Sequence, residues 1–95
     1  MTLGDIVTQL NERKQRATYA AVAEHLDGRP RPRWLMKGIE RCRRYSWVVA
    51  RRTGWPTGYA ERQIHPDCLS QIRDGSPKVI DNADELKRWL RARSG

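Results

Sequence analysis

The chain has 95 residues, of which 38% are hydrophobic and 32% charged. This length and composition predict one domain with a modest core over residues 1–95, and the chain is too short for a second domain. No apolar run approaches the roughly 18 residues that cross a bilayer, and residues 1–6 lack the basic and apolar regions of a secretory signal. The chain contains two cysteines, too few for a disulfide framework. We therefore expect a cytoplasmic protein without a membrane partner.

Positive charge is concentrated in one segment. The chain carries 19 basic and 11 acidic residues, a net charge of +8, and 15 of the basic residues are Arg. Residues 29–52 hold nine of the basic residues and one acid, Glu40, so this segment alone carries +8 and the rest of the chain is neutral. The planar guanidinium of Arg suits phosphate groups. The segment therefore indicates a phosphate-binding surface, with a solvated charged face as the alternative.

The N-terminal half predicts three helices. Apolar residues at helical spacing predict the first, with Thr2 as its N-cap and a polar stretch over residues 11–16 at its end. The apolar residues are Leu3, Ile6, Val7 and Leu10. A second helix is predicted over residues 19–26, capped by Thr18 and stopped near Gly28. After a stiff turn over residues 29–32, a third helix is predicted to run to about Cys42.

The C-terminal half predicts a hairpin and two helices. Aromatic and β-branched residues over residues 45–50 predict a strand, and residues 63–65 a return strand after a loop rich in turn residues. A short helix is predicted from Pro66 to Arg73, with Gly75 beyond its end. Asp81 is predicted to cap a last helix with apolar residues at Ala83, Leu86, Trp89 and Leu90.

This order of elements predicts an α+β fold that is mainly helical. Three helices followed by a short β-hairpin wing and a C-terminal helix are typical of a winged helix-turn-helix domain. Such folds place their third helix in a DNA groove, and here the third helix and the wing carry the basic segment. The candidate DNA-binding residues on these two elements and on the turn before the third helix are Arg31, Arg33, Trp34, Lys37, Arg41, Arg51 and Arg52.

Four short segments, over residues 18–23, 33–38, 48–54 and 86–90, carry a family resemblance. From Thr18 onward the chain resembles the C-terminal DNA-binding domain of O6-alkylguanine-DNA alkyltransferases, and in particular the alkyltransferase-like proteins that lack the reactive cysteine. The family's reactive Pro-Cys-His-Arg segment precedes its Val-Val strand. Here residues 45–47 read Tyr-Ser-Trp. The resemblance therefore implies a DNA-binding protein that is not an enzyme.

The resemblance also implies roles for two residues. Tyr19 matches the Tyr that crowds a phosphate and helps to rotate a nucleotide out of the duplex, so it joins the candidate DNA-binding residues. Arg33 matches the Arg that fills the vacated place, and a planar cation can replace part of the stacking lost when a base is extruded. The alternatives are that Tyr19 is a core aromatic and that Arg33 makes a simple phosphate contact.

No cofactor or metal is expected. His65 and Cys68 are the only closely spaced pair among the histidines and cysteines, whereas structural zinc sites usually show two such pairs. The leading hypothesis is a monomeric, non-enzymatic protein that binds double-stranded DNA, recognises alkylated bases by nucleotide flipping and acts with repair proteins. The alternatives are a small winged-helix transcription regulator that does not flip bases, and a protein-interaction module for an acidic partner.

Overall fold

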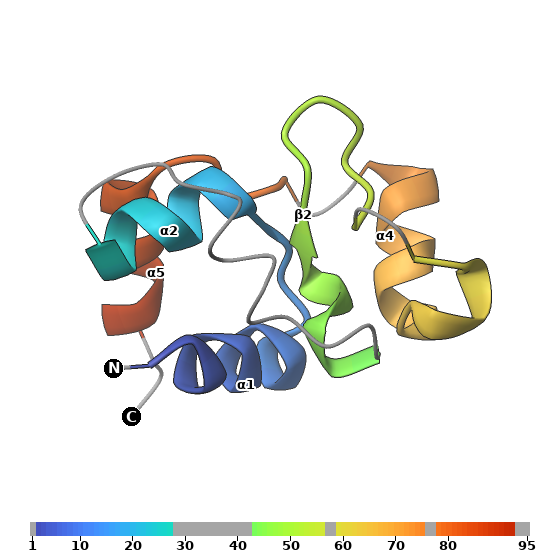
Figure 1. Cartoon of the computed structure of the whole chain (residues 1–95), viewed down its shortest axis with the longest axis horizontal. Helices are drawn as coiled ribbons and strands as arrows, with labels where there is room; N and C mark the ends of the chain where they lie inside the picture. The colour runs from blue at the N-terminus through green and yellow to red at the C-terminus, as the bar shows by residue number, and fades with distance from the viewer. Residues whose placement is uncertain (1, 28–42, 57–58, 76–77, 93–95) are drawn as a thin grey trace.

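A computed structural model describes residues 2–27, 43–56, 59–75 and 78–92. Within these ranges the chain is mainly helical, with a small parallel sheet of two strands (Figure 1). The elements in chain order are α1 (Leu3–Arg13), β1 (Ala17–Thr18), α2 (Tyr19–Asp27), the 3-10 helix η1 (Arg43–Trp47), β2 (Val48–Val49), the 3-10 helix η2 (Glu61–Gln63), α4 (Pro66–Asp74) and α5 (Ala83–Arg91). The predicted third helix lies outside the described residues.

Helix α1 begins as its sequence predicts. The Asp5 N–H donates to Thr2 Oγ1 at 3.2 Å, and the Thr2 N–H donates to Asp5 Oδ2 at 2.9 Å. This reciprocal capping box satisfies two backbone donors at the helix start. Ile6, Val7 and Leu10 are fully buried on the inner face, which confirms the predicted apolar stripe.

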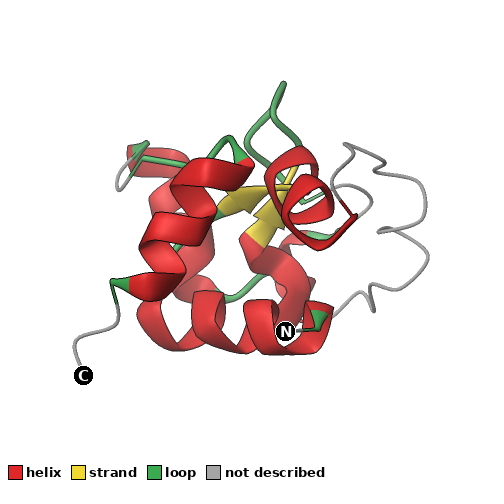
Figure 2. Ribbon diagram, turned by 90° about the vertical axis from the view of Figure 1, so that its left-hand side faces the viewer, coloured by secondary structure: helices red, strands yellow, loops and turns green. Residues whose placement is uncertain are grey.

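The sheet pairs two segments that are far apart in sequence. Ala17 lies opposite Val48 and Thr18 opposite Val49 in parallel register, and a bridge joins Ala17 to Ile80. The Thr18 N–H donates to the Ile80 carbonyl at 2.9 Å, and the Ile80 N–H donates to the Arg16 carbonyl at 3.0 Å. Figure 2 shows the strands at the centre of the molecule, with helices around them.

The predicted hairpin is wrong. Of the strand expected over residues 45–50, only Val48–Val49 is extended, because Arg43–Trp47 forms η1. The expected return strand overlaps η2 at Gln63 and forms no strand. The physical reason is that the backbone of Val48–Val49 is paired with Ala17–Thr18. Both valines are buried at this pairing, which a solvent-exposed wing would not achieve.

Helices α2 and α5 pack against each other (Figure 1). Thr18 caps α2 as predicted, since its Oγ1 accepts the Ala21 N–H at 3.1 Å. The prediction that Asp81 caps α5 is wrong by one residue. The cap is Asn82, whose Oδ1 accepts the Glu85 N–H at 2.8 Å, while Asp81 bonds to Arg51 instead.

Helix α4 confirms the short helix predicted after His65. Pro66 occupies its first turn, and Gly75 ends it with a positive φ of 71°, a left-handed conformation that Gly adopts without the strain of a Cβ. Among the described residues, no helix has the length and apolar character that spanning a membrane requires.

Candidate nucleic-acid interface

Three of the eight candidate DNA-binding residues lie in the described part of the chain: Tyr19 at the start of α2, and Arg51 and Arg52 just after β2. The structure does not bring Tyr19 to the surface beside the two arginines. It is 6% exposed and belongs to the hydrophobic core. This burial agrees with the alternative in which Tyr19 is a core aromatic. The other five candidates, Arg31, Arg33, Trp34, Lys37 and Arg41, lie outside the described residues.

A tight loop follows β2 and carries Arg51 and Arg52 at its beginning. The Gly54 N–H donates to the Ala50 carbonyl at 2.8 Å, and the Ala50 N–H donates to the Trp55 carbonyl at 2.9 Å, which closes the loop on itself. Gly54 has a positive φ of 74°, so this position favours Gly. Both arginines are exposed on this loop.

Arg51 is held in place by Asp81. Its Nε donates to Asp81 Oδ1 at 2.6 Å, and one of its terminal nitrogens donates to the Asp81 carbonyl at 3.0 Å. The side chains are 63% and 46% exposed, so the ion pair adds little stability. The two hydrogen bonds instead orient the Arg51 guanidinium beside the segment that leads into α5.

A pocket of about 350 Å³ lies where these segments meet. It is lined by Arg16, Thr18, Ala50, Arg51, Gly54, Gly75, Lys78, Val79 and Asp81, and we call it the basic pocket. Three of these side chains are cationic and one is a carboxylate. The pocket therefore has a net charge of +2 from its side chains, which favours an anion.

Arg16 gives the basic pocket a buried cation. The residue is 4% exposed, and burial lowers the pKa of its guanidinium. An Arg side chain in a protein stays charged at neutral pH. A Cβ built on Gly54 would lie 3.8 Å from Arg16 Nη1, so the loop passes close to the guanidinium. The Gln15 side chain links the segment before β1 to the segment before α5, because its amide donates to the carbonyls of Arg16 and Lys78, at 2.9 and 2.7 Å.

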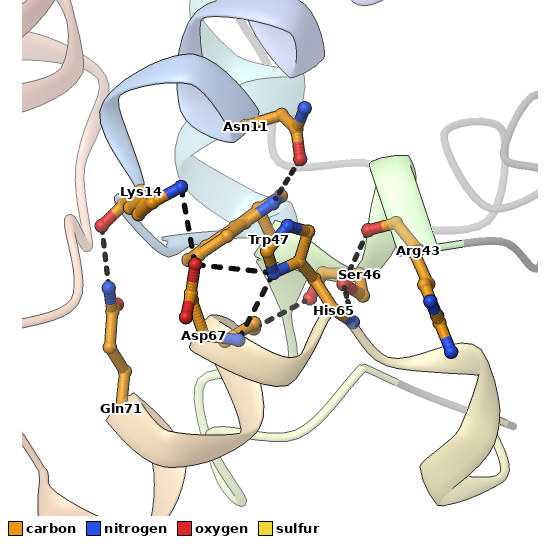
Figure 3. A network of polar contacts seen from close by, with 9 residues as sticks. Asn11, Lys14, Arg43, Ser46, Trp47, His65, Asp67 and Gln71 are labelled. Atoms are coloured by element: carbon orange, nitrogen blue, oxygen red, sulfur yellow. Dashed lines mark hydrogen bonds and ion pairs between the residues drawn. The ribbon is translucent and has the colours of Figure 1, made fainter.

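A polar network anchors η1 and therefore the strand and loop that follow it (Figure 3). Trp47 is fully buried, and its Nε1 donates to Asn11 Oδ1 at 2.9 Å. The Ser46 hydroxyl donates to the Arg43 carbonyl at 2.6 Å and accepts the His65 N–H at 3.0 Å. These contacts tie η1 to α1 on one side and to the start of α4 on the other.

The network continues along α4 (Figure 3). His65 Nδ1 accepts the Asp67 N–H at 3.1 Å, so His65 acts as the N-cap of α4. Lys14 Nζ lies 3.2 Å from Asp67 Oδ2, and Gln71 Nε2 donates to the Lys14 carbonyl at 2.7 Å. His65 and Asp67 therefore have structural partners at the start of α4.

Cys68 lies beneath this network as a buried thiol. It is fully buried, and its Sγ lies 3.4 Å from the Ser46 carbonyl, to which it donates. Burial raises the pKa of this thiol to about 11, so almost no thiolate forms at neutral pH and the sulfur is a poor nucleophile. In the described part of the chain, no three side chains of the His, Cys, Asp or Glu type are placed to hold a metal ion.

Sequence reasoning missed three charged residues of the basic pocket: Arg16, Lys78 and Asp81. The sequence predicts that Arg16 belongs to the polar end of the first helix and that Asp81 is a helix cap, and it indicates no role for Lys78. They meet because β1 pairs with β2 and bridges to Ile80. The local sequence holds no signal for these pairings.

Comparisons of the chain with protein-family models, with curated proteins and with solved structures find no match.

Proposed function

We propose that this chain is a non-enzymatic protein that binds double-stranded DNA through a basic surface that includes Arg51, Arg52 and Lys78. The observation that carries the proposal is the placement of Arg51, Arg52 and Lys78. Arg51 and Lys78 line the basic pocket together, and Arg52 follows on the same exposed loop. Cationic side chains on an anchored loop are suited to contacts with a phosphate backbone, which fix position without reading sequence.

The distribution of charge supports this proposal. Residues 29–52 carry the whole net charge of +8, and the loop with Arg51 and Arg52 is the C-terminal end of that segment. In the proposed mode of binding, residues 33–41 would enter a groove through Arg33, Lys37 and Arg41. The loop after β2 would contact the flanking backbone in place of a hairpin wing.

Recognition of alkylated bases is a narrower form of the proposal, and it rests on the family resemblance. In this form Arg33 enters the base stack after a nucleotide is extruded. With Tyr19 only 6% exposed, any contact of Tyr19 with a phosphate is restricted to a small part of its side chain. Alkyl transfer is left out of the proposal, because Ser46 and Trp47 stand where the family has its reactive segment and Cys68 is a buried, protonated thiol.

The experiment that tests the proposal compares two Arg→Gln variants for binding to a labelled duplex by fluorescence anisotropy. Arg52→Gln should weaken binding by roughly threefold to tenfold on any duplex sequence, because one phosphate contact is lost. Arg62→Gln in η2 is the matched control, since Arg62 is also exposed but does not belong to the loop after β2. Equal affinities of wild type and Arg52→Gln would exclude this loop from the interface.

The same assay separates the narrower form from its alternatives. Matched duplexes with and without O6-alkylguanine are compared for wild type and Arg33→Ala. Base recognition predicts that Arg33→Ala loses about 1–3 kcal/mol more on the damaged duplex than on the intact one. An equal loss on both leaves a plain DNA-binding protein. Absence of duplex binding even at low salt would favour an acidic protein partner instead.

A further inference from the structure

We infer that the basic pocket is a binding site for a phosphate monoester. The site does not depend on duplex DNA being the ligand of the exposed loop. It is built from Arg16 before β1, from Arg51 and Gly54 in the loop after β2, and from Gly75 at the end of α4 with Lys78, Val79 and Asp81 before α5. The parallel pairing of β1 with β2 and the bridge from Ala17 to Ile80 hold these parts together.

The charge of the pocket matches a dianion. Arg16, Arg51 and Lys78 supply three positive charges and Asp81 one negative charge, a net +2. The C-terminal end of α4 at Gly75 opposes this with a partial charge of about −0.5. A phosphate monoester carries about −1.5 to −2 at pH 7, whereas a backbone diester carries one negative charge. The lining therefore complements a monoester better than a diester.

The donors come from side chains. The amides of Gly54 and Gly75 already donate to the carbonyls of Ala50 and Gln71, at 2.8 and 2.7 Å, so they cannot form an amide nest for the anion. Arg16 supplies a cation that is 4% exposed, and a guanidinium removed from water interacts strongly with an anion. Asp81 orients Arg51 through two hydrogen bonds, which reduces the entropy lost on binding.

The size of the pocket limits the ligand. Its volume of about 350 Å³ is near the lower end of the range of about 300–1,000 Å³ found for small-molecule sites. One phosphate group with a small attached group fits this space. Such a monoester is found at the phosphorylated end of a nucleic-acid strand and on free sugar phosphates. The two sources share the chemistry that the pocket recognises.

The test is an NMR titration of the full chain at constant ionic strength, followed at the amides of Gly54 and Gly75. Methyl phosphate is the monoester probe and dimethyl phosphate the diester probe. We expect saturable shifts with methyl phosphate and at least about tenfold weaker binding of dimethyl phosphate, because the extra charge of the monoester faces a buried cation. Absence of saturable shifts, or equal affinity for the two probes, would overturn the inference.

Two Lys→Gln variants show whether the pocket itself binds the probe. Lys78 is exposed at the rim, so Lys78→Gln should fold normally and weaken methyl phosphate binding by about threefold to fivefold. Lys87→Gln on α5 is the matched control, because Lys87 is also exposed but does not line the pocket. Equal weakening by both variants would mean that general surface charge attracts the probe, and the inference would fail.

Two further ligands identify the source of the monoester. A trinucleotide with a 5′-phosphate is compared with the same trinucleotide ending in a 5′-hydroxyl, and with ribose 5-phosphate. Tighter binding of the phosphorylated trinucleotide than of ribose 5-phosphate assigns the pocket to strand ends. The reverse order assigns it to a free sugar phosphate. Equal binding of the two trinucleotides, with ribose 5-phosphate binding no tighter than either, contradicts the site. Since none of these probes is a duplex, failure here leaves the proposed DNA binding intact.

Discussion

Arg16 and Cys68 show how burial acts on two ionisable side chains in one part of the core. Burial disfavours the charged form of each, so it lowers the pKa of the Arg16 guanidinium and raises that of the Cys68 thiol. Each side chain partly offsets the shift of the other through its charge, but desolvation is the larger cause for both. At neutral pH Arg16 is therefore a cation and Cys68 a neutral thiol, which favours anion binding over thiol chemistry.

The raised pKa of Cys68 makes stability depend on pH above pH 9. The thiol has an ordinary pKa of 9.0 and a folded pKa of about 11, so the folded state retains a proton that the unfolded state releases. The contribution of the protonated thiol to the free energy of unfolding is complete below pH 9 and is lost as the pH rises toward 11. Between pH 8 and pH 10, urea unfolding should show wild type losing about 1 kcal/mol more than Cys68→Ala.

Cys68→Ala is the proper comparison, because every other titrating group is the same in the two proteins. The variant should be less stable at all pH values, since it leaves a cavity, and only the difference in pH dependence tests the thiol. Identical pH dependence of the two proteins would contradict a buried, protonated Cys68. A mass gain at Cys68 after incubation with alkylated DNA would contradict it independently.

The elements that were predicted correctly carry their signals locally. Thr2 with Asp5 marks the start of α1, Thr18 the start of α2, and Pro66 and Gly75 the two ends of α4. Each signal is a residue type whose side chain or backbone satisfies a helix end within a few residues. Where competing caps are adjacent, the local signal is ambiguous. Asp81 and Asn82 both suit an N-cap, and Arg51 on a distant loop engages Asp81.

The hairpin prediction failed for a non-local reason. Residues 45–50 have high β propensity, but Trp47 is buried with its indole N–H on Asn11 of α1, and the chain around it turns as η1. The pairing partner of β2 is β1, about thirty residues earlier in the chain. Strand propensity depends on such tertiary neighbours, so a single sequence could not identify the partner.

The cap of α5 gives a prediction for one element. Asn82→Ala should lower the free energy of unfolding by about 1 kcal/mol, because the Glu85 N–H loses its acceptor. Asn82→Asp should retain the stability, since a carboxylate accepts the same bond and interacts favourably with the helix dipole. Thermal and urea unfolding measure both variants. If Asn82→Asp lost as much as Asn82→Ala, residue 82 would not be acting as the cap.

In the whole molecule, some residues of the candidate site are evident from the charge of the sequence, and others become evident only from the fold. Arg51 and Arg52 stand out in the sequence because they belong to the basic segment over residues 29–52. Arg16 and Lys78 lie in parts of the chain without net charge, and the fold brings them to the basic pocket through the pairings of Ala17. Prediction of these two residues therefore required the topology, which the local sequence did not specify.

We propose that the loop with Arg51 and Arg52 and the basic segment over residues 29–52 bind DNA phosphates. The most direct measurement is the affinity of the wild-type protein for a labelled duplex as a function of salt concentration. If the surface makes roughly four to six phosphate contacts, the logarithm of the association constant should fall linearly with the logarithm of salt concentration, with a slope of about −4 to −5. An affinity that does not change with salt, or no binding at low salt, would contradict the claim.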